Sequence, residues 1–288
     1  MTDNTSEEIG RKPWWRSVAD EPKPVDLHPE IPHSARMYDY FLGGKDNFPA
    51  DRAAADQAVA ATPTIAVAAR QNRAFMRRAV RHLASDLGIR QFLDVGTGIP
   101  TSPNLHEVAQ GIAPECRVVY ADNDPIVLAH ARALLASTPQ GRTAYLDADV
   151  RDPDGILAAP VLRDTLDLSQ PVALSLIALF HFIPDSEDPH GIIGRLVGAM
   201  PSGSYLVLSH GTGDFEPALR DAAASYRKQG VSAQLRTLAE VTALFGGTEL
   251  LDPGIVPAHL WRPDGDGAVD GELPGQQAGI YAGIARIL

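Results

Sequence analysis

Short apolar runs and helical stripes alternate along most of the chain. The runs are continuous and bounded by turn residues, which is typical of strands buried on both faces of a sheet. They span residues 89–95, 117–121, 143–146, 172–176 and 204–209, with weaker runs at 249–251 and 280–286. Helical patterns separate them, so the sequence predicts an α/β fold with a doubly wound, mostly parallel sheet that binds ligands at the carboxyl ends of its strands.

Capping residues predict where several helices begin. The pair Ser102-Pro103 predicts a helix that ends at residue 110, and Asp124-Pro125 predicts one that ends at residue 136. Thr237 opens a capping box for a helix that ends near residue 246, and a further helix is expected at 192–200.

The N-terminal part has a different pattern. Residues 1–30 are charged and rich in proline, which predicts an irregular arm, and Trp14 and Trp15 are expected to dock it onto the rest of the protein. Residues 51–87 are predicted to form two helices interrupted at 62–64, with Gly88 just past the second helix.

Composition narrows the classes of function. The 288 residues carry a net charge of −11, which argues against nucleic acid as a partner. Five arginines cluster at residues 70–81 and are interpreted as a solvated helix face. Cys116 is the single cysteine, so no disulfide within the chain is possible. The polar N-terminus and the shortness of every apolar run predict a cytoplasmic protein without a membrane span.

The segment Asp94-Val95-Gly96-Thr97-Gly98 ends a predicted strand and is the strongest indication of a ligand. Glycines at such a turn let the backbone approach a ligand closely. A dinucleotide-binding loop carries a third glycine where this chain has Thr101, and no Tyr-x-x-x-Lys pair is present, which argues against a nicotinamide-dependent oxidoreductase.

Two further acidic residues follow later strands. Asp122 ends the next predicted strand, where a carboxylate accepts hydrogen bonds from ribose hydroxyls, and Asp149 follows the third. In this order, the glycine turn, Asp122 and Asp149 resemble the class I S-adenosylmethionine-dependent methyltransferases, and residues 175–182 resemble the segment after their fourth strand. Residues 33–48, HSARMYDYFLGGKDNF, resemble the opening signature of an actinobacterial methyltransferase family long catalogued as a domain of unknown function.

The resemblance implies a Rossmann-like, seven-stranded sheet with an N-terminal helical extension, and S-adenosyl-L-methionine as the cofactor. It also implies three parts: a flexible arm at 1–30, a signature loop with a helical cover at 31–90, and a methyltransferase core at 91–288. The implied cofactor-binding residues are Arg36, Tyr40, Asp94, Gly96, Thr97, Gly98, Asp122, Asn123, Asp149, Val150 and Leu176. No metal site is expected, because the acidic segment 185–190 matches no familiar ligand spacing.

Within this set, the resemblance assigns the ribose diol to Asp122, and the adenine ring to Asn123, Asp149 and the Val150 backbone. Pro100 stands where many such loops have a further glycine, so the resemblance does not determine the backbone geometry where the chain leaves the turn. Arg36 is either the partner of the methionine carboxylate or a member of a structural ion pair.

His181 follows the fourth strand, where it either lines the acceptor site or acts as a general base. The expected reaction is methyl transfer to a small molecule, with the tail at 257–279 lining the acceptor site. The alternative is a non-catalytic protein that binds or senses S-adenosylmethionine, and the oligomeric state is not readable from the sequence.

Overall fold

The computed structural model describes residues 27–134, 137–215, 219–220, 223–224, 227, 230–264 and 279–288. The predicted docking of Trp14 and Trp15 therefore lies outside the described residues, as does the tail from 265 to 278. Among the residues described, no helix has both the length and the apolar character to cross a bilayer.

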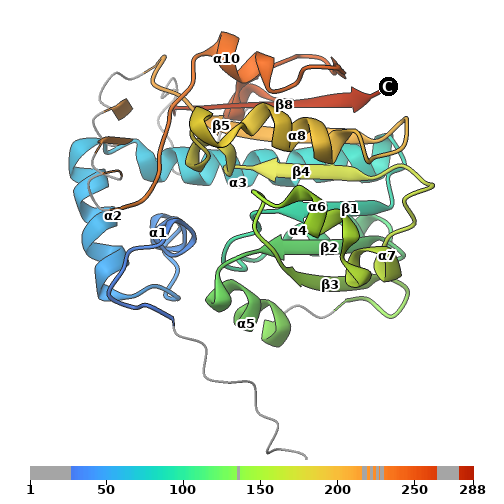
Figure 1. The fold of residues 1–288 in the computed structure, drawn as a ribbon, viewed down its shortest axis with the longest axis horizontal. Helices are drawn as coiled ribbons and strands as arrows, with labels where there is room; N and C mark the ends of the chain where they lie inside the picture. Colours follow the sequence, from blue (N-terminus) through green and yellow to red (C-terminus); the bar gives the residue numbers. More distant parts are fainter. Residues whose placement is uncertain are drawn as a thin grey trace, which may run out of the picture.

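A mixed sheet forms the centre of the molecule (Figure 1). Its strands are β1 (Gln91–Val95), β2 (Arg117–Asp122), β3 (Arg142–Asp147), β4 (Ala173–Ile177), β5 (Tyr205–Gly211), β6 (Thr248–Leu250), β7 (Val256–Pro257) and β8 (Ile280–Ile287). They are arranged in the order β3-β2-β1-β4-β5-β8-β6, and β7 also pairs with β8. The first five strands run parallel and β8 runs antiparallel to its neighbours, so the Rossmann-like prediction is confirmed. The sequence predicted seven strands, and the short β7 is the eighth.

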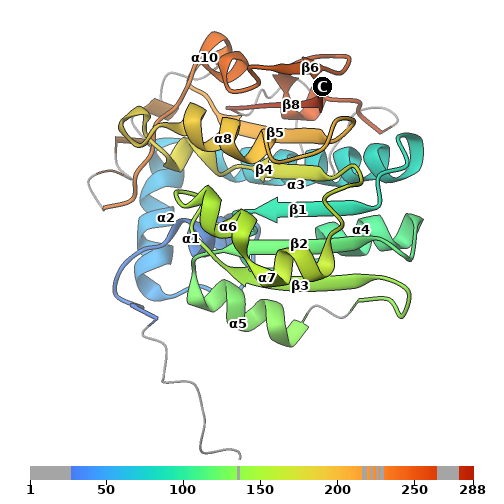
Figure 2. The same cartoon turned by 45° about the vertical axis from the view of Figure 1, so that its right-hand side comes forward.

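Helices cover both faces of this sheet (Figure 2). They are α1 (Ser34–Phe41), α2 (Pro49–Ala61), α3 (Ile65–Arg81), α4 (Leu105–Ile112), α5 (Pro125–Leu134), α6 (Pro153–Ala158), α7 (Pro160–Thr165), α8 (Pro189–Val197) and α10 (Leu238–Ala243). Short turns complete the described elements: η2 (His82–Asp86), η3 (Phe180–Phe182), η4 (Asp185–Glu187) and η5 (Ala258–Leu260).

Successive side chains of a strand point to opposite faces of the sheet, so the core is divided into two clusters. Leu93 of β1 packs toward α6, α7 and α8, whereas Phe92 packs toward α3 and α4. Helix α3 belongs to the second cluster through Phe75 and Val80, so it is a layer of the core. Helices α1 and α2 instead lie beyond the carboxyl ends of the parallel strands (Figures 1 and 2). The N-terminal helices thereby close the sheet edge where a ligand is expected.

Most of the predicted boundaries are confirmed, but two helix starts are wrong. Helix α8, expected at 192–200, begins at Pro189, because Asp188 caps it by accepting a hydrogen bond from the Gly191 N–H. Helix α4 begins at Leu105 rather than at Pro103, because Asn104 and Glu107 form a capping box there. Asp124 caps α5 as predicted, accepting a hydrogen bond of 2.9 Å from the Ile126 N–H. The predicted end of this helix at residue 136 lies outside the described residues.

The arginine cluster on α3 is not the solvated face that composition suggested. Arg78 is 7% exposed and donates hydrogen bonds to the carbonyls of Ala258 (2.6 Å) and Trp261 (2.9 Å). Trp261 is fully buried against Phe75, with ring centroids 5.4 Å apart. Residues 258–261 therefore pack behind the sheet and do not line a cavity at its carboxyl edge.

Candidate functional site

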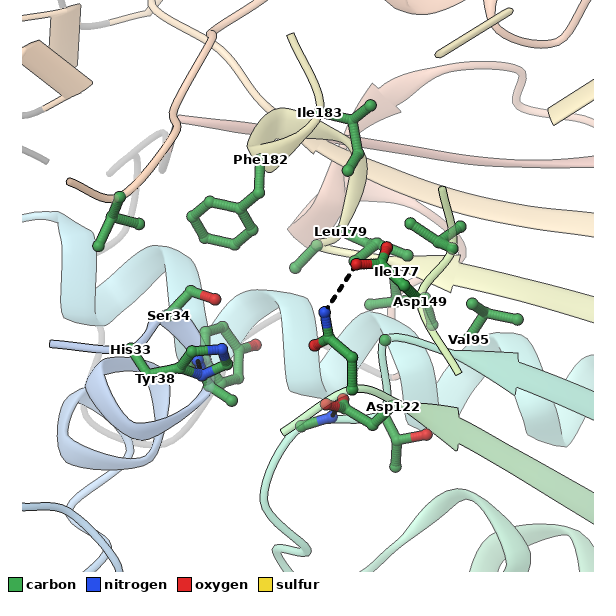
Figure 3. A pocket seen from close by; sticks show the side chains of 18 of the residues that line it. His33, Ser34, Tyr38, Val95, Asp122, Asp149, Ile177, Leu179, Phe182 and Ile183 are labelled. Atoms are coloured by element: carbon green, nitrogen blue, oxygen red, sulfur yellow. Dashed lines mark hydrogen bonds between the residues drawn. The ribbon is translucent and has the colours of Figure 1, made fainter. Parts of the chain in front are cut away.

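A cavity of about 400 Å³ lies at the carboxyl ends of β1, β2 and β4. His33, Ser34 and Tyr38 lie on its α1 side, opposite Asp122 and Asp149 at the strand ends (Figure 3). Its volume lies in the range of small-molecule sites, about 300–1,000 Å³. Parallel strands place their last residues along one edge, so residues far apart in sequence gather here.

The glycine turn after β1 forms the floor of this cavity. Gly96 has a φ of +73°, a conformation that favours glycine, and its N–H donates to the Ala121 carbonyl at 2.8 Å. A Cβ at Gly96 would lie 2.6 Å from Cδ1 of Leu179, which also lines the cavity. The Thr97 hydroxyl donates to the Asp94 carbonyl at 3.1 Å and closes the turn. The turn is therefore tightly packed on one side and open to the cavity on the other.

Asp122 is held at the centre of the cavity edge by two backbone N–H groups. Oδ2 accepts from Gly98 at 2.8 Å and Oδ1 accepts from Asp124 at 2.9 Å. Burial raises the pKa of Asp122 above its usual range, while the two N–H donors and His33 act in the opposite direction. Its carboxylate therefore has a fixed orientation and further lone pairs for a ligand.

A second polar pair joins the residue after β2 to the segment after β3. Nδ2 of Asn123 donates to Oδ2 of Asp149 at 3.0 Å, the bond dashed in Figure 3. Oδ1 of Asp149 accepts the Arg151 N–H at 2.9 Å, and Val150 is buried beside them. Asn123, Asp149 and Val150, which the sequence predicted to bind the cofactor, all line the cavity.

Opposite charges face each other near β1. Asp94 lines the cavity, and burial raises its pKa to about 6, while Arg73 and Thr97 act to lower it. The Arg73 guanidinium also lines the cavity and donates to the carbonyls of Thr101 and Pro103, the latter at 2.9 Å. The cavity therefore carries a carboxyl group and a guanidinium at the same end.

Arg36, by contrast, does not line the cavity. It is 3% exposed, its Nε lies 3.4 Å from Oδ1 of Asp51, and its other nitrogens donate to the Ile31 (2.8 Å) and Leu27 (3.1 Å) carbonyls. These contacts correspond to the structural ion pair rather than to a ligand carboxylate. Arg73 lines the cavity, whereas Arg36 does not.

Tyr40 and Leu176 also lie away from the cavity. The Tyr40 hydroxyl donates to Oδ1 of Asp56 at 2.8 Å, because α1 turns this side chain toward α2, and Tyr38 lines the cavity instead. Leu176 is fully buried in the cluster shared with α6 to α8, since the strand alternation directs it to that face. Ile177 and Leu179 line the cavity after β4.

His181 lines a smaller, apolar cavity that adjoins the first. Burial, and then His210 and Arg236, lower the pKa of His181 to about 3, so its ring is uncharged near neutral pH. An uncharged ring of such low basicity argues for the lining interpretation over the general base. Behind it, Arg236 donates to the Phe180 and Ile183 carbonyls at 3.0 Å each and holds the segment after β4.

A hydrogen-bonded chain joins α1, α3 and the ends of β4 and β5, and the sequence prediction missed it. The Ala178 N–H donates to Ser209 Oγ (2.9 Å), which donates to Asn72 Oδ1 (2.6 Å). Asn72 Nδ2 donates to the Tyr38 hydroxyl at 2.9 Å. Positions 72 and 73 lie four and three residues before Met76, on the apolar stripe of α3. This spacing was the signal in the sequence that both positions face the sheet.

Comparisons with known proteins agree with this geometry. The sequence profile of the S-adenosyl methyltransferase family matches residues 20–288. The structure is similar to that of a DUF574-family protein from Streptomyces avermitilis, with 53% identity over 91% of this chain and all of that chain, and a TM-score of 0.88. It is also similar to a Thermobifida fusca protein proposed to be a methyltransferase, with 42% identity, coverage of 92% and 98%, and a TM-score of 0.84. No curated protein matches the chain.

Proposed function

The chain belongs to the S-adenosyl methyltransferase family, whose cofactor is S-adenosylmethionine, and we propose that it transfers the cofactor's methyl group to a small molecule. The observation that carries the proposal is the order of polar groups along one cavity. Arg73 of α3 and Asp94 of β1 come first, followed by Asp122 at the end of β2 and Asp149 after β3. These groups complement an amino acid, a ribose and an adenine in the same order.

The residues present fit the cofactor. A guanidinium and a carboxylate complement the carboxylate and ammonium of its amino acid part, and Asp122 retains acceptor capacity for two ribose hydroxyls. Gly98 has a φ of +67° and no atom within 4 Å of the position of a Cβ, so its backbone leaves open space toward the cavity. The donor set and the open glycine turn are thus compatible with the whole ligand.

When bound, the cofactor supplies an electrophilic methyl group on a sulfonium sulfur: a lone pair of the acceptor forms the new bond to carbon, and the carbon–sulfur electron pair stays on sulfur. An O–H or N–H acceptor then loses its proton to bulk solvent as the methylated product leaves the site. The protein's own contribution is alignment and exclusion of water, which reduce the entropic cost of this displacement. His181 is not needed as a base, in keeping with its lowered pKa.

Each part of the chain has a role in this proposal. Residues 31–90 supply the cover of the cavity through α1 and the polar face of α3, and residues 91–288 supply the turns that hold the cofactor. Residues 1–30 are proposed to act as an arm outside this site. Tyr38 and Ser34 of the cover line both this cavity and the smaller apolar cavity beside it, so the cover borders the place where cofactor and acceptor meet.

Two measurements test the proposal. Calorimetry with S-adenosylhomocysteine tests the site, and incubation with methyl-tritiated S-adenosylmethionine and a small-molecule extract of the source cell tests the transfer. Binding with labelled product is the expected result. Binding without transfer to any extract component would favour the sensing alternative, and absence of binding would contradict the site itself.

A further inference from the structure

A second, apolar cavity of about 110 Å³ adjoins the cofactor cavity. We call it the annex. The two cavities share Ser34, Tyr38, Ala178 and Phe182, so the annex opens beside the place where the reacting group of the cofactor is expected. Several parts of the fold form its remaining wall, including Phe41 of α1, Ala68 of α3, Leu235 before α10 and Ile280 of β8.

The described wall of the annex is uncharged. Among its described lining residues there is no Asp, Glu, Lys or Arg. The Tyr38 hydroxyl is already engaged, because it donates to the Ala69 carbonyl at 3.0 Å and accepts from Asn72. His181 is the remaining titratable side chain, and burial together with His210 and Arg236 keeps its ring uncharged near neutral pH. A charged group placed here would lose its hydration without gaining a partner.

The size of the annex limits what it accepts. A buried apolar cavity of about 150 Å³ accommodates one benzene molecule. The annex, at about 110 Å³, is close to that size and much smaller than the cofactor cavity of about 400 Å³. One ring or a short branched alkyl group fills such a volume, whereas a fused polycyclic group exceeds it.

We propose that the annex binds an uncharged apolar group of the methyl acceptor, about the size of one six-membered ring. This inference rests on the proposed function, since it takes the adjoining cavity to hold the cofactor. The acceptor class is then a molecule with a compact aromatic or branched aliphatic end, whose nucleophilic atom lies near Tyr38 and Ala178. The burial of that end supplies the binding energy, at about 25 cal/mol per Å² of apolar surface.

Toluene is the probe of choice, with benzoate and benzylammonium as charged molecules of similar shape. Binding is measured by ligand-observed NMR on the full chain saturated with S-adenosylhomocysteine. The Ala68→Leu variant fills the annex from α3. The matched control is Ala66→Leu on the same helix, because Ala66 packs against the apolar cluster around the annex but lines neither cavity itself.

We expect toluene to bind the wild type and Ala66→Leu with the same affinity. Its affinity for Ala68→Leu should be about tenfold lower or not measurable. The affinity for S-adenosylhomocysteine should stay within about twofold in all three proteins. We also expect both charged analogues to bind about tenfold more weakly than toluene. Any of three results would overturn the inference. These are equal binding of toluene to the two variants, charged analogues that bind as tightly as toluene, and a wild type that does not bind toluene at all. If the wild type does not bind S-adenosylhomocysteine, that result would instead contradict the proposed function.

Discussion

The backbone N–H of Gly98 donates a hydrogen bond of 2.8 Å to Oδ2 of Asp122. This bond joins the turn after β1 to the end of β2, two segments separated by 24 residues. The Asp124 N–H occupies the other carboxylate oxygen at 2.9 Å, so the position of Asp122 is determined from both sides. One side chain therefore shapes the glycine turn and faces the ligand.

Replacing Asp122 tests this double role. Asp122→Ala leaves two N–H donors without their acceptor and removes the proposed ribose contact, each a hydrogen bond to a charged group worth about 1.5–3 kcal/mol. We expect the affinity for S-adenosylhomocysteine to fall by about tenfold to a hundredfold in calorimetry. Asp122→Asn retains one carbonyl acceptor and is expected to lose less. Unchanged affinity in the alanine variant, with the fold intact by circular dichroism, would exclude Asp122 from the site.

Arg73 is expected to bind the ligand carboxylate. Arg73→Ala removes a guanidinium from the cavity, so the affinity for S-adenosylhomocysteine should fall by about tenfold or more. Arg77→Ala is the control, because Arg77 lies one turn along the same helix and does not line the cavity. Adenosine, which lacks the carboxylate, should bind both variants as it binds the wild type. A loss of adenosine affinity equal to that of S-adenosylhomocysteine would show that Arg73 acts on the fold of the site instead.

Arg36 is expected to act on stability. Its guanidinium lies 3.4 Å from Asp51 and 3.9 Å from Asp124, and all three side chains are buried. Removing one member of a buried ion pair leaves an uncompensated charge, so Arg36→Ala should lower the free energy of unfolding by about 3–5 kcal/mol in urea titrations. At a temperature where the variant remains folded, its ligand affinity should match that of the wild type. The opposite outcome, lost affinity at unchanged stability, would restore Arg36 as the carboxylate partner.

Gly96 and Gly88 form a matched pair for testing the glycine turn. Both have φ near +70°, but a Cβ at Gly96 meets Leu179, whereas a Cβ at Gly88 meets no atom within 4 Å. Alanine at either position should cost about 1–2 kcal/mol of stability from backbone strain. Only Gly96→Ala should also reduce ligand affinity, because it displaces Leu179 into the cavity. Equal affinity of the two variants in calorimetry would contradict the close packing of this turn.

The parts of the site that the sequence predicted are those defined by strand ends. Asp94, Asp122 and Asp149 end or follow parallel strands, and such strands bring their carboxyl ends to one edge whatever the details of packing. Leu176 and Tyr40 do not line the cavity, because the motif alone does not give the phase that decides which face of a strand or helix a residue occupies. Ile177 and Tyr38 are the neighbours that line the cavity.

Arg73 and Asn72 were missed for a different reason. Their chemistry depends on how α3 crosses the sheet, and a charged residue on a long helix is on average solvated. The apolar stripe that includes Phe75 and Met76 continues toward these positions, so the helix presents the polar pair of its middle turns to the strand ends and its apolar residues to the core. The annex was not visible either, because its wall combines side chains from α1, α3, β8 and the segment before α10.

The raised pKa of Asp94 gives the site a predictable dependence on pH. Burial raises this pKa to about 6, whereas an aspartate in an unfolded chain titrates near about 3.9. Between these values the folded protein keeps a proton that the unfolded chain has released, so the stability due to Asp94 is present below about pH 4 and is lost as the pH rises through about 6. Asp94→Asn does not titrate. The unfolding free energy of the wild type relative to the variant should therefore fall by about 2–3 kcal/mol from pH 4 to pH 7.

Ligand binding should show the opposite trend, because an ammonium group favours the ionised carboxylate. The affinity of the wild type for S-adenosylhomocysteine should therefore decrease as the pH is lowered from 7 to 5, relative to that of Asp94→Asn. Taking this difference removes the contributions of the groups that the two proteins have in common. Stability is measured by urea titration and affinity by calorimetry at matched pH values. A difference that stays constant across the window in both measurements would show that Asp94 is ionised throughout and does not sense the ligand.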